Sequence, residues 1–484
     1  MGRALWTLVV LLAPALATAA GPRIEVRLPA GDGPSLGGRL VVALAPGGRE
    51  PVFTEADAPG LVVVGVDATL APGRSAVLGA DVLAFPSQAA WADLPAGTYT
   101  VRAVFATNRD VSTLTAAGNR YCAPARVALK PDAVTVLTLD RVHADASPAD
   151  SATHQYLTLP SRKLSAFHGR PMACRVGVVL PKDFAADTTK RYPLAVHVGG
   201  FGQRYTSARR TPPDARFVQL HLDGAGPFGD PYQVNSAVNG PYGDALVEEI
   251  IPEVERRFRC IGTGKTRFVE GGSTGGWVSL ALQLFYPDTF NGCWAQCPDG
   301  VDFRAFQLAD LSRDANMYVN QHGFDRPARR TVDGDTVYTV RHECRLEQVL
   351  GRGGQWTLGG QQWASWNAVY GPRAADGSPV PLWDGTTGVF DRNVVKQWGK
   401  YDLRKHLERE WPTLGPKLAG KVHIWVGDAD DYFLNNAVHR FQAAAKQLAN
   451  PAFDGVIEIV PRMGHTSGWG RAKVLDAMAA RAGK

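Results

Sequence analysis

After its first 20 residues, the sequence of 484 residues has no apolar run long enough to span a bilayer. A membrane-spanning helix needs about 20 predominantly apolar residues. At the start of the chain, Arg3 precedes an apolar stretch at residues 4–16, and small residues ending in Ala-Thr-Ala follow at 17–19. That stretch is too short to span a membrane, and the order is typical of a secretory signal peptide. The sequence therefore predicts a signal peptide at residues 1–20 and a secreted or periplasmic protein with no membrane span after cleavage.

Cysteine is scarce, with six residues in the chain. Cys293 and Cys297 form a C-x3-C pair, but no second cysteine or histidine pair lies at zinc-finger spacing. We therefore expect no metal ion and no cofactor. In an exported protein the cysteines would mature in an oxidising compartment, so we expect one to three disulfides, with the pairing open. The cysteines are Cys122, Cys174, Cys260, Cys293, Cys297 and Cys344.

The chain also lacks a concentrated basic run. Its formal net charge of +6 comes from scattered arginines, with short pairs such as Arg209-Arg210 and Arg256-Arg257. Solvated surface charge explains this pattern, because a nucleic-acid interface gathers its basic residues on one face. We expect no nucleic-acid partner.

The length of the chain exceeds what one hydrophobic core usually supports, which favours two domains. Residues 21–142 alternate short apolar runs with Gly/Pro turns, as in the run 40–44, and this rhythm predicts a small all-β, sandwich-like domain. Residues 143–152 are small, polar and proline-bearing, as in a linker. Residues 153–484 alternate strand-like and helix-like runs, which indicates an α/β domain with a mostly parallel central sheet.

Within the α/β domain, helical spacing of apolar residues predicts helices at 244–259 and 277–285. The segment at about 301–420 reads as irregular, and we interpret it as an insertion or cap. Its tryptophans could stack on sugar or aryl rings, although packing in a cap explains them about as well. Strands are predicted at 174–180, 194–198, 217–222, 267–270, 293–296, 422–426 and 456–460.

The motif that carries chemistry is Gly271-Gly272-Ser273-Thr274-Gly275, between the predicted strand 267–270 and a helix-like run. This is G-x-S-x-G in a strand-turn-helix context, where a tight turn leaves the serine hydroxyl projecting above the sheet. Small residues surround the serine because bulky ones would clash in such a turn. We therefore predict Ser273 as a nucleophile.

A serine hydroxyl needs a base to take its proton and an acid to orient that base, in the chain order Ser, acid, His for this kind of sheet. His465 lies on a glycine-bearing loop after the predicted strand 456–460, whereas His423 lies within a strand and His439 on a helix. We predict His465 as the base. The acid is expected after strand 422–426, where Asp430 is preferred by its spacing and Asp431 and Asp428 are alternatives.

Hydrolysis through a tetrahedral intermediate also needs hydrogen-bond donors for the developing oxyanion. One donor is the backbone N–H of Thr274, directly after the nucleophile. The second is expected after the predicted strand 194–198, from Gly200 or Phe201.

Taken together with the runs at 192–200 and 246–252, these motifs resemble the esterase D-like branch of the α/β hydrolases. That branch includes feruloyl and acetyl-xylan esterases and S-formylglutathione hydrolase. The resemblance covers most of residues 156–484 and implies the α/β-hydrolase fold. It departs at Val198-Gly199, where the family usually has His-Gly, and at the long segment 301–420.

The sequence thus predicts an exported serine hydrolase of carboxylic esters that acts through an acyl-serine intermediate. Its substrate would be a small-molecule or polysaccharide-linked ester, such as a carbohydrate or phenolic ester. An acyltransferase or a serine peptidase would use the same triad. The non-enzymatic alternative is a carbohydrate-binding protein with an inactive hydrolase domain.

Overall fold

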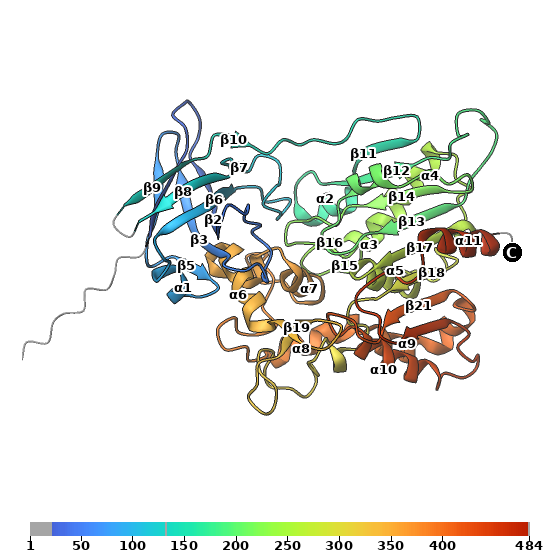
Figure 1. Ribbon diagram of the computed structural model, residues 1–484. Helices are drawn as coiled ribbons and strands as arrows, with labels where there is room; N and C mark the ends of the chain where they lie inside the picture. The colour runs from blue at the N-terminus through green and yellow to red at the C-terminus, as the bar shows by residue number, and fades with distance from the viewer. Residues whose placement is uncertain (1–21, 131–132, 483–484) are drawn as a thin grey trace, which may run out of the picture.

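The structure, a computed structural model, describes residues 22–130 and 133–482. Two β-sheets at the start of the chain lie beside a larger sheet covered by helices (Figure 1). The predicted signal peptide, residues 1–20, lies outside the described residues. Across the two described ranges, no helix has both the length and the apolar character needed to cross a membrane.

We call residues 22–142 the N-terminal β region. Its strands form one sheet in the order β4-β1-β9 and a second in the order β10-β7-β6-β2-β3-β5, with β8 paired to β6. They are β1 (Arg23–Arg27), β2 (Leu36–Pro46), β3 (Val62–Leu70), β4 (Ser75–Leu78), β5 (Leu83–Phe85), β6 (Gly97–Ala106), β7 (Arg120–Tyr121), β8 (Ala125–Leu129), β9 (Val134–Thr138) and β10 (Arg141–Val142), with the short helix α1 (Gln88–Ala92).

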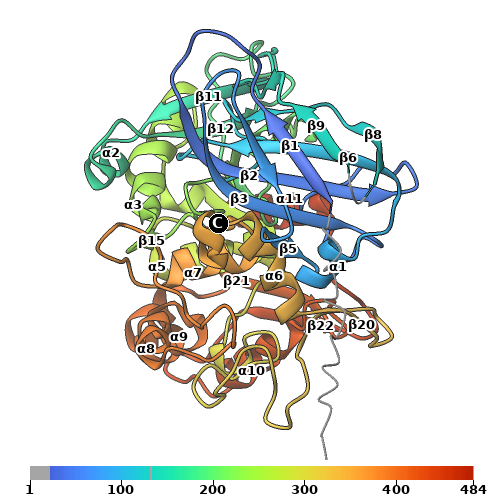
Figure 2. The same cartoon turned by 90° about the vertical axis from the view of Figure 1, so that its left-hand side faces the viewer.

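Strand β2 explains how this region attaches to the rest of the chain. Side chains alternate between the two faces of a strand. On one face, Leu40 and Val42 belong to the core between the two sheets, together with Ile24 of β1. On the other face, Val41 packs in a separate cluster with Val349 of helix α6 (Val340–Leu350). Both faces of β2 are therefore buried, and the second sheet is covered by α6 (Figure 2).

The larger sheet is α/β in character. Its strand order is β11-β12-β14-β13-β17-β18-β21-β22, in which β12 is antiparallel to both neighbours and the strands from β14 to β22 are parallel. Each predicted strand is present, and β11 is an additional edge strand. The bounds are β11 (His154–Pro160), β12 (Ala173–Val179), β13 (Leu194–Val198), β14 (Val218–Leu222), β17 (Arg267–Gly272), β18 (Cys293–Gln296), β21 (Val422–Gly427) and β22 (Val456–Val460).

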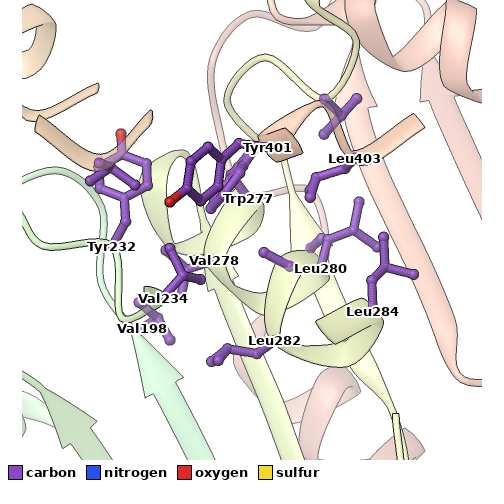
Figure 3. Packing of buried hydrophobic residues seen from close by; sticks show 14 of the residues in the cluster. Val198, Tyr232, Val234, Trp277, Val278, Leu280, Leu282, Leu284, Tyr401 and Leu403 are labelled. Carbon is purple, nitrogen blue, oxygen red and sulfur yellow. The ribbon is translucent and has the colours of Figure 1, made fainter. Parts of the chain in front are cut away.

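Helices follow these strands and bury their apolar residues against the sheet. In Figure 3, Trp277 and Val278 of helix α5 lie beside Tyr232 and Val198, within one buried cluster. Besides α6, the helices are α2 (Arg162–His168), α3 (Tyr242–Ala245), α4 (Ile251–Arg257), α5 (Thr274–Phe285), α7 (Gln362–Tyr370), α8 (Arg392–Trp398), α9 (Leu403–Leu414), α10 (Asn435–Ala445) and α11 (Arg471–Ala482); a π-helical turn at Leu246–Ile250 joins α3 to α4.

The segment 301–420 is more regular than expected, because it contains α6 to α9 and the hairpin of β19 (Pro327–Arg330) and β20 (Thr336–Thr339). Its tryptophans form a packed core rather than a row of exposed rings. Trp356 and Trp383 stack with ring centroids 4.2 Å apart. Tyr370 joins this core to Trp277 of α5, with centroids 5.1 Å apart. The five tryptophans are at most 3% exposed, so packing accounts for Trp356, Trp363, Trp383 and Trp398, while the packed Trp366 also borders a cavity.

The expectation of one to three disulfides is wrong for this structure, in which all six cysteines are free. Five of them are buried, and Cys174 is partly buried. Burial raises the pKa of Cys174, Cys260 and Cys293 to about 12, because an apolar environment disfavours the thiolate. Such thiols react slowly with oxidants, because the thiolate is the reactive form.

Candidate active site

Ser273 lies in the turn between β17 and α5, at the carboxyl end of the sheet. Its backbone has φ 58° and ψ −124°, a conformation that is rare for a residue with a side chain. The turn is held by hydrogen bonds from Ser273 N to Gln296 O (2.9 Å) and from Gly276 N to Ser273 O (2.8 Å). This is the strained strand-turn-helix geometry that the G-x-S-x-G motif predicts.

The glycines of the motif are required by close backbone packing. A Cβ atom on Gly275 would lie 2.0 Å from Val198 O, and one on Gly271 would lie 2.3 Å from the same oxygen. A Cβ on Gly276 would lie 2.5 Å from Gln296 O. The elbow therefore fits between β13 and β18 only because these positions have no side chains.

His465 lies on the loop after β22, and its imidazole contacts one of the predicted acids. Its Nδ1 is 2.8 Å from Oδ2 of Asp430. Asp430 is fully buried, and its other oxygen, Oδ1, accepts hydrogen bonds from the backbone N–H groups of Tyr432 (2.9 Å) and Leu434 (3.2 Å). A buried carboxylate held in this way fixes the orientation and the tautomer of the ring.

The two alternative acids contact the backbone of the same loop, and neither has a hydrogen bond to the imidazole. Asp431 Oδ1 accepts the backbone N–H of His465 (2.8 Å), and Asp428 Oδ1 accepts that of Arg462 (2.6 Å). Both carboxylates thus shape the histidine loop, while Asp430 contacts its side chain. The geometry favours Asp430 among the three.

Ser273 and His465 line the same cavity, which has a volume of about 360 Å³. No hydrogen bond joins the two side chains among the residues that the structure describes. Such bonds are often long before substrate binds. The imidazole also contacts the sulfur of Cys297, which follows β18.

The predicted oxyanion donors lie on either side of the nucleophile. Thr274 begins α5, and Phe201 lines the cavity together with Ser273. A Cβ atom on Gly200 would be 3.9 Å from Cβ of Ser273, so this backbone passes directly beside the serine. All three predicted residues are therefore at the site.

The sequence analysis missed Asp299, which is 2% exposed and lines the cavity. Its Oδ2 accepts hydrogen bonds from Tyr232 (2.6 Å), Thr274 Oγ1 (3.1 Å) and Trp366 Nε1 (3.1 Å). Asp299 therefore ties the first residue of α5 to segments far away in the sequence. Its position just after β18 was a usable signal, because polar groups at the carboxyl ends of parallel strands converge on one site.

The cavity also contains residues from outside the large sheet, which the sequence analysis did not anticipate. Residues 54–57 of the N-terminal β region line it. Asp57 forms an ion pair with Arg329 of β19 (Oδ2 to Nη1, 3.0 Å), and the ring of His342 is hydrogen-bonded to Ala56 O (2.9 Å). No sequence pattern in residues 54–57 indicates this role, because it depends on how the β region docks on α6.

The pKa values of the buried groups in the cavity are shifted by different causes. Burial raises the pKa of Asp299, and raises that of Glu343 on α6 to about 7. Burial lowers the pKa of His465, but its hydrogen bonds to Asp430 and to Cys297 outweigh this effect, and the net shift is upward. A base with a raised pKa is fully active only at higher pH.

We found no group of three or more His, Cys, Asp or Glu residues able to hold a metal ion in the described part of the chain. The groups around Ser273 are instead a hydroxyl, an imidazole and a buried carboxylate. This arrangement can perform nucleophilic catalysis with proton transfer through the imidazole.

No family model matches the chain, and no curated protein matches it. Solved structures that are similar to the chain include a ferulic acid esterase, with 14% identity, a TM-score of 0.38 and coverage of 68% of this chain and 98% of that chain. FphF, a fluorophosphonate-binding serine hydrolase of Staphylococcus aureus, also has 14% identity and a TM-score of 0.38, with coverage of 68% and 99%. For an S-formylglutathione hydrolase of Agrobacterium tumefaciens, the values are 12%, 0.36, 69% and 97%. At such identities and TM-scores, the activity has to be judged from the site itself.

Proposed function

We propose that this protein is a serine hydrolase of carboxylic esters with the α/β-hydrolase fold. The observation that carries the proposal is the contact of 2.8 Å between the buried Asp430 and His465, in a cavity shared with a serine on a strained elbow. A surface serine near a histidine would have neither the buried acid nor the strained backbone. The fold assignment rests on the elbow and on the resemblance to esterase D-like proteins.

In the proposed reaction, Ser273 Oγ attacks the ester carbonyl carbon and its proton passes to His465, which Asp430 orients. The N–H groups of Thr274 and of Gly200 or Phe201 stabilise the oxyanion. Collapse of the tetrahedral intermediate breaks the carbonyl–oxygen bond, and His465 returns the proton to the leaving alcohol. Water then attacks the acyl-serine by the same route, which releases the carboxylic acid and restores Ser273.

The test is labelling with a fluorophosphonate probe, together with hydrolysis of simple aryl esters. We expect labelling and turnover by the wild type and neither by Ser273→Ala. The matched control is Ser467→Ala, because Ser467 Oγ lies 3.3 Å from where a Cβ on Gly272 would be, close to the elbow. Labelling that survives in Ser273→Ala and disappears in Ser467→Ala would overturn the proposal.

Acyl transfer to an alcohol or sugar would use the same groups with an acceptor other than water. Adding glycerol or a sugar alcohol and measuring the ester product separates transfer from hydrolysis. Cleavage of an amide would instead indicate a peptidase. Export of the protein is proposed from residues 1–20 alone.

A further inference from the structure

The cavity around Ser273 contains more carboxylates than the proposed ester hydrolysis requires. Glu343 and Glu347 of α6 line it, as do Asp299 and, from the N-terminal β region, Glu55 and Asp57. Among the described residues, the lining contains one arginine, Arg329, and no lysine. A neutral ester needs one carboxylate, that of the triad, so the excess of carboxyl groups over basic groups suggests a second purpose.

Most of these carboxylates already have donors. Glu347 accepts the N–H groups of Trp363 (2.8 Å) and Ala364 (2.9 Å) in the first turn of α7. Asp57 is paired with Arg329, and Glu55 with Arg49. These acids therefore serve structural roles at the wall of the cavity.

Glu343 is different, because only one of its oxygens has a donor. Oε2 accepts a hydrogen bond from Trp363 Nε1 (2.7 Å), and Oε1 has no hydrogen-bond partner among the described residues. The Trp363 bond fixes the carboxylate in one orientation, so Oε1 is held ready for a donor from a ligand.

Gln307 supplies a second, independent observation. Its side chain lines the same cavity and is 4% exposed, and its buried Oε1 has no hydrogen-bond partner within the described part of the chain. Leaving a buried acceptor unsatisfied costs about 1 to 3 kcal/mol, which a ligand donor would offset. The residue is also held at φ 53°, within a turn where Phe306 and Ala309 bond each other.

Aromatic side chains complete the lining. Phe201, Tyr338, Trp366 and Tyr432 all line the cavity. The faces of aromatic rings attract cations, and a carboxylate beside them adds direct charge attraction. The unpartnered acceptor oxygens of Glu343 and Gln307 and the aromatic rings match an organic ammonium ion, whose charge would also favour the carboxylate form of Glu343.

We infer that this cavity binds an ester with an ammonium group, and that Glu343 and Gln307 accept the N–H groups of that cation while Ser273 faces the carbonyl. The inference rests on the proposed function and names its substrate class. Glu343 and Gln307 determine specificity and take no part in the proton transfers.

The test compares kcat/KM for matched ester pairs in which one member carries an ammonium group and the other does not. One pair has the charge in the acid half: the ethyl esters of phenylalanine and of 3-phenylpropanoic acid. The other has it in the alcohol half: 2-(dimethylamino)ethyl butanoate, which is protonated at neutral pH, and its neutral isostere 3-methylbutyl butanoate. We expect the wild type to prefer the cationic member of at least one pair by about tenfold or more.

Glu343→Gln keeps the shape and the Trp363 bond but removes the charge, so it should reduce that preference by about 10- to 100-fold. The preference is a ratio of two kcat/KM values, so a general effect of the substitution on turnover cancels. Glu410→Gln, on the exposed side of α9 where Glu410 pairs with Arg409, is the matched control and should keep the preference. An unchanged preference in Glu343→Gln, or no cationic preference in the wild type, would overturn the inference.

Inhibition of the wild-type protein needs no variant, so it tests the inference even if Glu343→Gln fails to fold. Benzylamine should inhibit neutral-ester hydrolysis competitively at a concentration about tenfold or more below that of benzyl alcohol. Gln307→Leu should weaken the benzylamine effect and spare that of the alcohol. Equal inhibition by the two compounds contradicts the inference. A wild type that hydrolyses no ester and takes no fluorophosphonate label contradicts the proposed function instead.

Discussion

The loops of the large sheet and the loop of the N-terminal β region face the same cavity but contribute different chemistry. Ser273, Asp430 and His465 follow β17, β21 and β22, where parallel strands end together. Residues 54–57 have no place in that pattern and reach the cavity because α6 holds the β region against it. The proposed reactive groups and part of the cavity wall thus come from different parts of the chain. Substitutions in the sheet loops and in the N-terminal β region should therefore affect different kinetic parameters.

The largest effect should come from the sheet loops. Asp430→Asn would favour the wrong tautomer of His465 and lower kcat by about 10³- to 10⁴-fold, without unfolding the protein. Asp428→Asn is the matched control, since Asp428 contacts the backbone of Arg462 and not the imidazole. Ester kinetics and thermal melting measure both variants. A deeper loss in Asp431→Asn than in Asp430→Asn would contradict the assignment of the acid.

The second-largest effect is expected at the contact between the N-terminal β region and helix α6, and it tests whether that region unfolds together with the large-sheet domain. Arg39 of β2 donates to Val349 O of α6 from Nε (3.0 Å) and Nη2 (2.9 Å). Arg39→Met removes both bonds and leaves a buried carbonyl unpaired, so the free energy of unfolding should fall by about 2 to 3 kcal/mol. Urea unfolding followed by tryptophan fluorescence measures the change, because ten of the twelve tryptophans lie beyond residue 153.

The control for this experiment is Arg27→Met, since Arg27 is exposed on β1 and bonds Thr138 of its own region. A fluorescence transition that is the same in Arg39→Met and in the wild type would mean that the β region folds independently. In that case the wall formed by residues 54–57 would not be a fixed part of the cavity.

A smaller effect is expected at that wall itself. Asp57→Asn removes the ion pair with Arg329. Because this pair is partly exposed to solvent, its loss should cost about 0.2 to 1 kcal/mol of interaction free energy. We expect KM for ester substrates to change by up to about fivefold, with kcat nearly unchanged. Asp32→Asn, in an exposed loop of the same region, should change neither. A large fall in kcat with KM preserved would place Asp57 in the chemistry instead of the wall.

The smallest effect concerns pH. In the proposed mechanism the unprotonated imidazole accepts the proton of Ser273, so kcat/KM should fall as the pH drops through the pKa of His465. Burial lowers that pKa, whereas the hydrogen bonds of His465 to Asp430 and to Cys297 raise it. Cys297→Ala should therefore move the acid limb of the pH profile to lower pH. Cys174→Ala, remote from His465, should leave it in place, and a shift to higher pH in Cys297→Ala would contradict the role of the contact.

Local patterns predicted the parts of this protein in which local chemistry decides the structure. In the sequence, the strands of the large sheet are short apolar runs, because a strand that is covered on both faces has apolar side chains on both. The elbow at Ser273 could be predicted because a tight strand-turn-helix connection needs glycine around the nucleophile. The order of serine, acid and histidine narrowed the acid to three neighbouring aspartates.

Packing between distant segments decided the rest. Which aspartate meets His465 depends on the path of the loop after β21, where Asp430 turns inward and Asp428 and Asp431 bond the backbone. The tryptophans of 301–420 looked like candidates for binding rings, but their burial reflects partners such as Tyr370 and Trp383. The expected disulfides are absent, because all six cysteines are free in the structure.

By itself, then, the sequence predicted the α/β sheet, the glycine-rich elbow at Ser273 and His465 as the proposed partner of that serine, because each depends on residues that are neighbours along the chain. Only the tertiary structure decided how β2 docks on α6 and that residues 54–57, Asp299, Gln307 and Glu343 share one cavity. Those contacts join segments that lie far apart in the chain, and no local spacing records them.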